Sequence, residues 1–345
     1  MTHMADEIRQ VPEVIERLLT DGMPAIRRAA RAIADRSPAW VGIAARGTSD
    51  HAATYARYLI ESVVGIPVVL TAPSINTIYG TSTSWSEGVL LLISQSGESP
   101  DLLAVLEAAR SDGCATITVT NNAQSPLARR ADYVIDYLVG EERSVAATKT
   151  YVASLTAIAL LVAAVEPGAA FDTGALPALT ARTIDAGAVW VADSGVVEAF
   201  AESPVSLVVG RGYNLSTALE VALKLIETSK RFAIGYSAAD LEHGPMVLAS
   251  ENAPVLFFES PGSMGVHTGP LRQRLIASGG DVWTVTANPE SISEARTLAL
   301  PIEVTDDLSP IPFVLPGQLL AEAVARRLGY DPDSPTGLTK VTQTL

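Results

Sequence analysis

An internal duplication constrains the fold of this 345-residue chain more than any other feature of its sequence. Ser111–Thr120 reads SDGCATITVT and Ala277–Thr286 reads ASGGDVWTVT, so that a glycine and a Thr-Val-Thr recur at an offset of 166. Two more pairs match at offsets of 165 and 166: Arg46-Gly47 with Arg211-Gly212, and Leu59-Ile60-Glu61 with Leu225-Ile226-Glu227. Chance explains any one match, but several at nearly one offset predict two homologous domains, which also suits the length.

Short apolar runs alternate with helical patterns in both halves of the chain. The strands predicted in the first half are Trp40–Ala44, Val68–Leu70, Val89–Ile93, Ala115–Val119 and Tyr133–Asp136. Helical patterns such as Ser49–Val63 and Pro100–Ser111 separate most of them. The pattern restarts near residue 205, with strands at Ser206–Val209, Pro254–Phe258 and Asp281–Val285. This alternation is typical of a parallel sheet covered by helices on both faces, so we predict an α/β fold.

The expected organisation has five parts. A helical segment over residues 1–35 precedes a first domain over 36–166, and a second domain covers 197–330. The linker, 167–196, begins with Pro and Gly and is expected to contain a helix from about Thr180. The last part is a polar tail over 331–345, whose composition alone is typical of a frayed terminus.

The composition argues against several functional classes. The formal net charge is −14 and the Arg pairs are scattered, so nucleic-acid binding is not expected. The longest apolar stretch, Val152–Val165, is too short to span a bilayer and is typical of a buried core helix. The N-terminus has no secretory signal pattern, and the single Cys114 cannot form an internal disulfide. We therefore expect a cytoplasmic protein that binds neither nucleic acid nor a membrane.

A serine-rich turn in the first half is a candidate phosphate site. Ser94–Ser99, SQSGES, follows a predicted strand and precedes a helix, an arrangement that presents backbone N–H groups and a positive helix end. Its serines would add hydroxyl donors, although a helix N-cap and a turn explain them equally well. A second polar turn, Gly47–Ser49, also follows a strand. The counterpart in the second half, Ser260–Ser263, has changed and gained a proline, which favours a single phosphate site in the first domain.

A charged stripe marks one helix of the second half. Ala218–Lys230 reads ALEVALKLIETSK, with Glu220, Lys224 and Glu227 at i, i+4 and i+7 on one helical face. A solvated face with a Glu–Lys pair would explain the stripe. The rest of the helix is apolar nearly all round, however, so we favour a buried helix whose charges line a cleft, where desolvation and pairing tune their pKa values.

His243 lies directly before Gly244-Pro245, which stops a helix, so the histidine is expected at the end of an element. A lone histidine is more often structural than catalytic. No His/Cys/Asp cluster has the spacing of metal ligands, and we expect neither a metal nor another cofactor.

Taken together, these motifs resemble the sugar isomerase (SIS) superfamily, and in particular the isomerase half of glucosamine-6-phosphate synthase. The similarity runs over nearly the whole chain. Its motifs are EIRQVPEVIERL at Glu7–Leu18, RGTSDH at Arg46–His51, SQSGES at Ser94–Ser99, SVAATKT at Ser144–Thr150, GRG at Gly210–Gly212, ALEVALKLIETS followed by DLEHGP, and DSPTGLTKV at Asp333–Val341. The resemblance implies two tandem SIS domains, each with a parallel five-stranded sheet flanked by helices in a flavodoxin-like three-layer sandwich.

The resemblance also implies roles for individual positions. Glu227 matches the base that moves a proton between C1 and C2, with Glu220 and Lys224 as its charged neighbours. His243 matches the ring-opening histidine, which the partner subunit delivers in the synthase, so a homodimer with a shared active site is implied. Lys340 matches a lysine of the closing C-terminal tail that engages the open-chain sugar. The positions that match phosphate ligands are Thr48, Ser49, Ser94, Gln95, Ser96 and Ser99, and those that match the sugar lining are Val145 and Ala147.

The implied function is that of an enzyme that binds a phosphorylated sugar and moves protons between its C1 and C2 carbons. The synthase makes ammonia in a separate N-terminal domain with a cysteine nucleophile, and this sequence begins where the isomerase half begins. We therefore favour a SIS-type glucosamine-6-phosphate deaminase, which forms fructose 6-phosphate and ammonia. The alternatives are a fructosamine-6-phosphate deglycase, an isomerase domain like that of glutamine–fructose-6-phosphate transaminase, and a non-catalytic sugar-phosphate sensor. A sensor would need only the serine turn, so the charged candidates speak against it.

Overall fold

The computed structural model describes residues 2–81, 83–169, 171–249, 253–288 and 296–340, and the chain divides into two compact units. The first-sheet unit comprises residues 13–142 and 149–174, together with the end of the tail from Thr339. The second-sheet unit comprises the residues up to Pro12, the segment Arg143–Thr148, and Ala175–Leu338. The last five residues of the expected tail, 341–345, lie outside the described residues.

The sheet of the first-sheet unit has five parallel strands in the part that the structure describes, in the order β2-β1-β3-β4-β5. Its strands are β1 (Trp40–Ala44), β2 (Val68–Leu70), β3 (Gly88–Ile93), β4 (Ala115–Thr120) and β5 (Tyr133–Asp136). In the register, Val41 of β1 lies opposite Val68 on one side and Val89 on the other. Every residue of β3 and β4 is buried, as expected for central strands covered on both faces.

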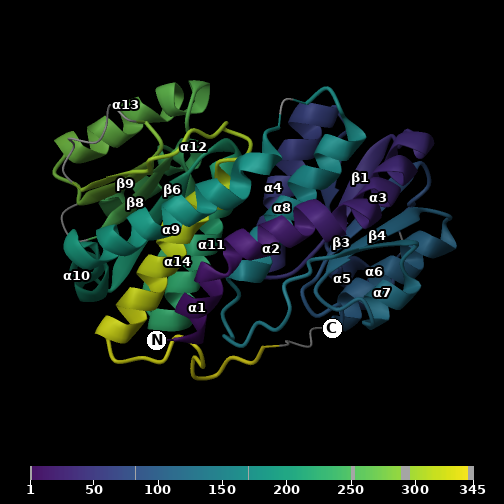
Figure 1. Ribbon diagram of the computed structural model, residues 1–345, viewed down its shortest axis with the longest axis horizontal. Coiled ribbons are helices and arrows are strands. Elements are labelled where there is room, and N and C mark those ends of the chain that lie inside the picture. The colour runs from purple at the N-terminus through teal and green to yellow at the C-terminus, as the bar shows by residue number, and fades with distance from the viewer. Residues whose placement is uncertain (1, 82, 170, 250–252, 289–295, 341–345) are drawn as a thin grey trace. The chain divides into compact units, whose positions relative to one another are not determined.

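Helices cover both faces of this sheet (Figure 1). The helices of this region are α2 (Val11–Arg17), α3 (Met23–Arg36), α4 (Thr48–Leu59), α5 (Ser74–Thr77), α6 (Pro100–Ser111), α7 (Pro126–Arg130) and α8 (Lys149–Val165). Leu102, Val105 and Leu106 of α6 pack with Leu90 and Leu92 of β3 in one buried cluster. Helices α3 and α4 each pack against α8, and α8 is buried along most of its length, as predicted for this apolar stretch.

The second-sheet unit repeats the topology. Its strands are β6 (Val205–Gly210), β7 (Phe232–Ser237), β8 (Val255–Glu259), β9 (Val282–Thr286) and β10 (Thr297–Ala299). They are parallel, in the order β10-β9-β8-β6-β7. Written from the other end, β7-β6-β8-β9-β10, this is the order of the first sheet with five added to each strand number. The order 2-1-3-4-5 is that of flavodoxin-like sheets. The predicted fold of two duplicated α/β domains is therefore confirmed.

Two strands of the second sheet were not predicted. Strand β7 reads FAIGYS, in which a glycine and partial exposure weaken the apolar signal, and β10 has only 3 residues. The glycine, Gly235, is needed because a Cβ there would lie 2.8 Å from the Cα of Leu219. Close packing of β7 on the neighbouring helix thus explains a residue that lowers strand propensity.

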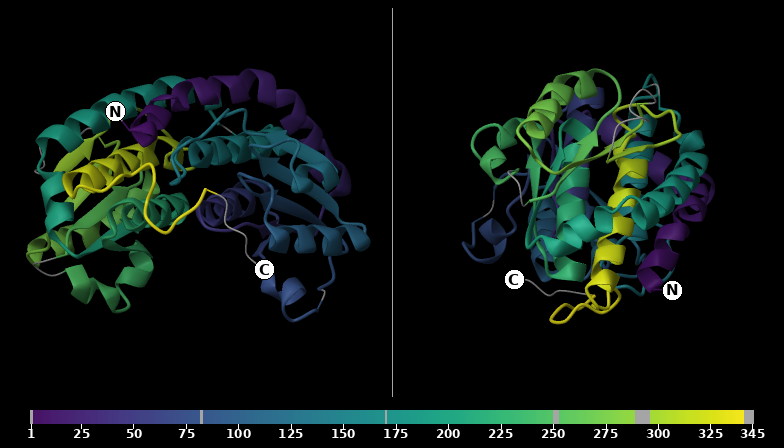
Figure 2. Two further views of the ribbon diagram at one scale, coloured as in Figure 1. Left: turned by 90° about the horizontal axis from the view of Figure 1, so that it is seen from below. Right: turned by 90° about the vertical axis from the view of Figure 1, so that its left-hand side faces the viewer.

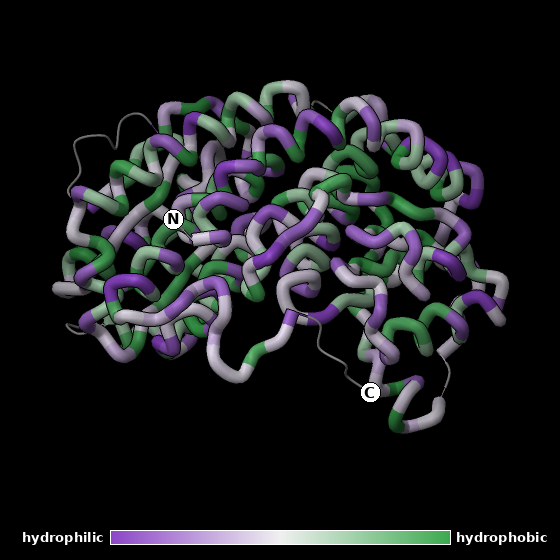
Figure 3. The backbone as a smooth tube through the Cα atoms, turned by 60° about the horizontal axis from the view of Figure 1, so that its bottom comes forward, coloured by the Kyte–Doolittle hydropathy of each residue, from purple (hydrophilic) through white to green (hydrophobic). Residues whose placement is uncertain are grey.

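The helices of the second-sheet unit are α1 (His3–Arg9), α9 (Leu176–Asp193), α10 (Val196–Glu202), α11 (Leu215–Ser229), α12 (Ala238–Leu241), α13 (Ser263–Ala277) and α14 (Pro310–Arg327). Helix α11 packs against β6 and β7 on one side and against α14 on the other, and Figure 2 shows α14 beside it. Hydrophilic and hydrophobic residues alternate along the outer helices (Figure 3). None of the helices in the described part of the chain is both long and apolar enough to cross a membrane.

Candidate active site

The serine turn Ser94–Ser99 connects β3 to α6 in the first-sheet unit, as predicted. The Ser94 hydroxyl accepts a hydrogen bond from the Gly97 N–H at 3.1 Å, and the Ser96 hydroxyl accepts one from the Glu98 N–H at 3.3 Å. Each hydroxyl that accepts in this way keeps its own O–H as a donor. The turn is therefore shaped by its serines while their protons stay available to an anion.

Residues of β4 and α7 form hydrogen bonds with the backbone of this turn. The Gly97 carbonyl accepts from the Leu127 N–H at 3.1 Å, and the Gln95 carbonyl accepts from the Thr120 hydroxyl at 3.2 Å. Gly97 has φ +65°, and a Cβ at this position would lie 2.1 Å from Oγ of Ser125. Glycine is required here both by the backbone conformation and by the close approach of Ser125.

The second polar turn, Gly47–Ser49, begins α4 directly after β1. Because β1 and β3 are neighbouring parallel strands, the two turns lie at the same edge of the sheet. Arg46 Nε pairs with Oδ2 of the buried Asp101 at 2.7 Å, which joins the start of α4 to the first turn of α6. Sequence reasoning missed Arg46, although its place directly before the polar turn was a visible signal.

The three charged residues of the predicted stripe are all on α11 in the second-sheet unit. The side chains of Glu220 and Lys224 are 0% exposed, whereas that of Glu227 is 22% exposed. Lys224 Nζ lies 3.4 Å from Oε1 of Glu220 and donates a hydrogen bond to Oε2 of Glu227. The helix is buried, as expected, but only the last carboxylate of the stripe reaches solvent.

Lys224 remains charged although it is buried. Burial alone would lower the pKa of its ammonium group, but the charges of Glu220 and Glu227 and hydrogen bonds to both outweigh that effect and raise the pKa to about 12. A permanent cation between two carboxylates compensates their negative charge in a region with little water. The arrangement holds Glu227 by one oxygen and leaves it the most accessible of the three groups.

His243 lies in the turn after α12 and is exposed. Its backbone N–H donates to the Asp240 carbonyl at 3.1 Å, and no side-chain contact of His243 is found among the described residues. Val247, four residues on, is 73% exposed. The structure thus does not join the histidine to the α11 carboxylates by a direct contact.

The tail lysine has a buried partner. Lys340 Nζ donates to Oε2 of Glu142 at 2.6 Å, and both residues belong to the first-sheet unit. Glu142 also accepts from the Thr150 N–H at 3.1 Å and from the Thr150 hydroxyl at 2.8 Å, at the start of α8. This contact connects Lys340 to the start of α8, whereas the composition alone suggested a frayed terminus.

The two predicted sugar-lining residues, Val145 and Ala147, are partly exposed in the segment Arg143–Thr148 of the second-sheet unit. In this segment exposure alternates, because Ser144, Ala146 and Thr148 are buried. Val145 and Ala147 are therefore the partly exposed residues between three buried ones, in a segment whose backbone bends at residues 144–146 and 148.

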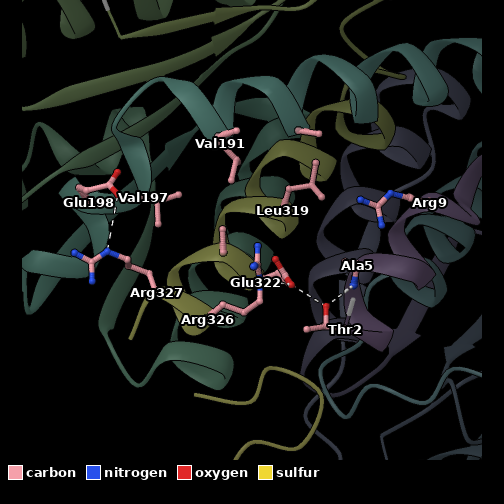
Figure 4. A pocket seen from close by; sticks show the side chains of 13 residues that line it. Thr2, Ala5, Arg9, Val191, Val197, Glu198, Leu319, Glu322, Arg326 and Arg327 are labelled. Atoms are coloured by element: carbon pink, nitrogen blue, oxygen red, sulfur yellow. Dashed lines mark hydrogen bonds and ion pairs between the residues drawn. The ribbon is translucent and has the colours of Figure 1, made fainter. Parts of the chain in front are cut away.

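A pocket of about 750 Å³ lies elsewhere in the second-sheet unit, on α1, α9, α10 and α14 (Figure 4). Each of its arginines has an acidic partner: Arg9 pairs with Asp6, Arg326 with Glu322 and Arg327 with Glu198. None of the predicted site residues lines it. Among the described residues, no group of three or more His, Cys, Asp or Glu side chains could hold a metal ion.

Comparison with known proteins gives consistent matches over most of the chain. The SIS domain family model matches residues 41–164 and 200–320. A glutamine–fructose-6-phosphate aminotransferase (isomerizing) of Methanothermobacter thermautotrophicus is 36% identical over 85% of this chain. The match covers 50% of that protein, and the chain spans about half the length of the curated relatives that it matches.

Two solved structures are also similar. A protein from Silicibacter pomeroyi DSS-3, provisionally described as a phosphosugar isomerase, is 32% identical with a TM-score of 0.86, and the match covers 96% of this chain and 100% of that one. The C-terminal domain of glucosamine-fructose-6-phosphate aminotransferase from Francisella tularensis is 25% identical with a TM-score of 0.84, and covers 97% of this chain and 98% of that domain.

Proposed function

The chain belongs to the SIS domain family, and from that premise we propose that it is an enzyme that isomerises and deaminates a phosphorylated amino sugar. The observation that carries the proposal is the charge arrangement on α11, where a buried cation supports two carboxylates and only Glu227 reaches solvent. A carboxylate that reaches solvent can take up and return one proton, while the fixed positive charge of Lys224 favours its ionised form and tempers its basicity.

The phosphate group of the substrate binds to the two polar turns of the first-sheet unit. The proposed ligands are Thr48, Ser49, Ser94, Gln95, Ser96 and Ser99. The free O–H groups of the turn serines and the N-terminus of α6 supply donors without a metal ion. Arg46 is half exposed beside Gly47–Ser49 at the same edge of the sheet, where its pairing with Asp101 compensates its charge.

Proton transfer is assigned to Glu227. In the open-chain aminoaldose, Glu227 takes the proton from C2 and returns it to C1, and a proton of the C2 amine moves to the aldehyde oxygen. C2 then carries an imine and C1 a hydroxyl group. Water then adds to C2 and ammonia leaves, so that the products are a ketose phosphate and ammonia. Lys224 balances the charge of Glu227 throughout, because its raised pKa keeps it protonated at neutral pH. Glu220 holds Lys224 in place, Lys340 engages the open-chain sugar, and Val145 and Ala147 line it.

His243 is proposed to open the sugar ring in the active site of a partner chain, within a homodimer. Its exposed turn and its lack of a described side-chain contact support a role outside its own unit. Mixing His243→Ala chains with Glu227→Gln chains should restore part of the activity in heterodimers. Recovery of no activity, with subunit exchange verified, would assign both groups to the same chain.

Cys114 has no part in the proposed chemistry. Its side chain is 5% exposed, and burial raises the pKa of its thiol to about 11, so it is not a thiolate at neutral pH. The chain's one cysteine is thus unsuited to releasing ammonia from glutamine. A second candidate function is synthesis in the reverse direction with ammonia from another source, which the similarity to isomerizing aminotransferases favours.

A substrate panel tests the proposal. Ammonia release is measured with glucosamine 6-phosphate and with fructosamine 6-phosphates, and amino sugar formation with fructose 6-phosphate plus ammonium. We expect ammonia and fructose 6-phosphate from glucosamine 6-phosphate, and no release by Glu227→Gln. Release from the fructosamine adducts alone would identify a deglycase, and amino sugar formation alone the synthetic reaction. Binding of these sugar phosphates without turnover would identify a sensor and contradict the proposal.

A further inference from the structure

Three segments that are far apart in the sequence meet at the segment Arg143–Thr148, all within the second-sheet unit. They are α1 at the N-terminus, the root of the tail at 331–333, and α14. Together they bond to the backbone of the segment at both of its ends. The side chains of Val145 and Ala147, by contrast, remain partly exposed.

Glu7 of α1 fixes the beginning of the segment. Glu7 is only 4% exposed. Its carboxylate accepts hydrogen bonds from the backbone N–H groups of Arg143 and Ser144, the latter at 3.3 Å. A buried carboxylate must be compensated by donors, and two consecutive backbone N–H groups also define the direction of the chain between them. The position of the segment therefore depends on an acidic side chain 136 residues away in sequence.

Asp333 joins the tail to both other elements. Its carboxylate accepts the N–H groups of His3 at 2.7 Å and Met4 at 2.8 Å, which are free donors of the first turn of α1. Its backbone carbonyl accepts the N–H of Val145 at 3.0 Å. One residue thus anchors the helix that carries Glu7 and also bonds directly to a proposed sugar-lining residue.

The far end of the segment is held as well. Gln318 Nε2 of α14 donates to the Thr148 carbonyl at 3.3 Å. With backbone bonds at Arg143, Ser144, Val145 and Thr148, the segment has little freedom to move its alternating side chains. The backbone that carries the two partly exposed side chains is then held on both sides of them.

We infer that Glu7 and Asp333 are positioning residues that hold Val145 and Ala147 against the sugar. The inference rests on the proposed function for the roles of these two residues. Neither acid touches the substrate in this account. Each acts through the backbone of the segment, and Asp333 makes the geometry of the segment depend on the same tail that carries Lys340 seven residues later.

The test compares Glu7→Gln with Asp6→Asn. Both remove one negative charge from α1. Asp6 is half exposed and pairs with Arg9 at 3.6 Å, and among the described residues no hydrogen bond or ion pair joins its side chain to the segment. The amide of Glu7→Gln keeps the shape but turns one acceptor into a donor that opposes a backbone N–H. Hydrogen–deuterium exchange is measured on peptides that cover residues 143–148, and kcat and KM are measured with the active substrate.

In Glu7→Gln we expect faster exchange confined to the segment and its neighbours, and a fall in kcat of about 10²-fold, as misplacement by about 1 Å produces. Binding of inorganic phosphate should stay unchanged, because the serine turn belongs to the other unit. Asp333→Asn should show the same pattern, and Asp6→Asn should behave as wild type.

Unchanged exchange in both acid variants would overturn the inference, and so would wild-type kcat in a variant whose segment exchanges faster. A uniform rise in exchange over the whole second-sheet unit would reduce Glu7 to a stability residue and would likewise overturn it. The exchange result does not require turnover. Failure of the proposed function, seen as inactivity of the wild type on every substrate, is therefore distinguishable from failure of the positioning role.

Discussion

The two copies of the duplicated unit differ in the turn that follows β3 in one and β8 in the other. The first turn has six residues, Ser94–Ser99, whereas the second has three, Ser260–Gly262. In the first, the hydroxyls of Ser94 and Ser96 accept only from N–H groups of their own turn. In the second, the Ser260 hydroxyl accepts from Asn214 at 2.9 Å and hydrogen-bonds to the Asp306 carboxyl group.

This difference supports the proposal that the first copy, and not the second, binds the phosphate group. A carboxyl group beside Ser260 already occupies the hydroxyl that an anion would need, and as a carboxylate it would repel a phosphate. The sheet topology is unchanged between the copies. The fold therefore tolerates a changed turn, because the turn lies outside the core that both copies share.

The helices after β1 and β6 differ in the opposite sense. At the offset of 166, Glu220, Lys224 and Glu227 of α11 correspond to Thr54, Tyr58 and Glu61 in the first copy. Glu61 is exposed and accepts from the Val68 N–H at 3.0 Å. Only the second copy places a cation between two carboxylates. The two copies thus differ where the proposal assigns phosphate binding to the first and proton transfer to the second.

The largest expected effect separates the two equivalent glutamates. Glu227→Gln should lower kcat by about 10²–10⁴-fold with KM little changed, because the shape is kept and the base is lost. Glu61→Gln removes the same charge at the matching position of the first copy and should leave kcat unchanged. Steady-state kinetics of both variants, with thermal unfolding as a check on folding, provide the measurement. Equal losses of kcat in the two variants would contradict a functional difference between the two helices.

The glycines of the two turns form the next pair. Both have positive φ, so Ala at Gly97 or Gly262 should cost about 1–3 kcal/mol of backbone strain. At Gly97 the new Cβ also meets Ser125, whereas at Gly262 nothing lies within 4 Å. Gly97→Ala should therefore lose an additional ~1–3 kcal/mol of unfolding free energy and should lose phosphate binding.

Chemical denaturation and calorimetric titration with inorganic phosphate test this pair. Gly262→Ala should retain the phosphate affinity of wild type despite its strain. If Gly262→Ala lost phosphate affinity and Gly97→Ala kept it, the phosphate would bind to the second copy, which would contradict the proposal.

A smaller effect is expected from single hydroxyls of the two copies. Ser96→Ala removes one donor to a charged group, a contact worth about 1.5–3 kcal/mol, so KM should rise about 10- to 100-fold. The loss should appear mainly in KM, because the phosphate is remote from the reacting carbons. Ser263→Ala, at the start of α13, should leave both constants unchanged. An equal rise in KM for both serines would contradict the single phosphate site.

The smallest effect concerns the carboxyl group in the second turn. Burial raises the pKa of Asp306 from 3.8 to about 6, with Asp307 adding to the rise and the Ser260 hydrogen bond opposing it. The folded state then binds the proton more tightly than the unfolded state. This stabilisation is present below about pH 3.8 and is lost as the pH rises through about 6.

As the pH rises from about 4 to 6, the melting temperature of Asp306→Asn should therefore increase relative to that of wild type. The melting temperature of Glu303→Gln, a change at an exposed residue, should follow that of wild type at each pH. If the melting temperatures of wild type and Asp306→Asn changed with pH in parallel, burial beside Ser260 would not raise the pKa of the Asp306 carboxyl group.

The sequence was sufficient to predict the duplicated α/β fold, because matching motifs at one offset and alternating apolar runs are local signals. It also placed Glu220, Lys224 and Glu227 on one helical face, since that follows from spacing alone. It could not show that two of them are fully buried, because burial depends on how β7 and α14 pack on α11. Nor could it reveal the contacts of Glu7, Asp333 and Asp306, which bring together residues distant in the chain.

The central claim is that Glu227 carries the proton between C1 and C2, and turnover in heavy water tests it most directly. The sugar phosphate product and the recovered substrate are analysed by NMR for deuterium at C1 and C2. Wild type and Glu61→Gln should place deuterium at one of these carbons, because the proton on the carboxylate exchanges with solvent between its removal and its return. Glu227→Gln should bind the substrate and leave both carbons unlabelled. Labelling by Glu227→Gln at the wild-type rate would contradict the account and would make Glu220 the next candidate for the base.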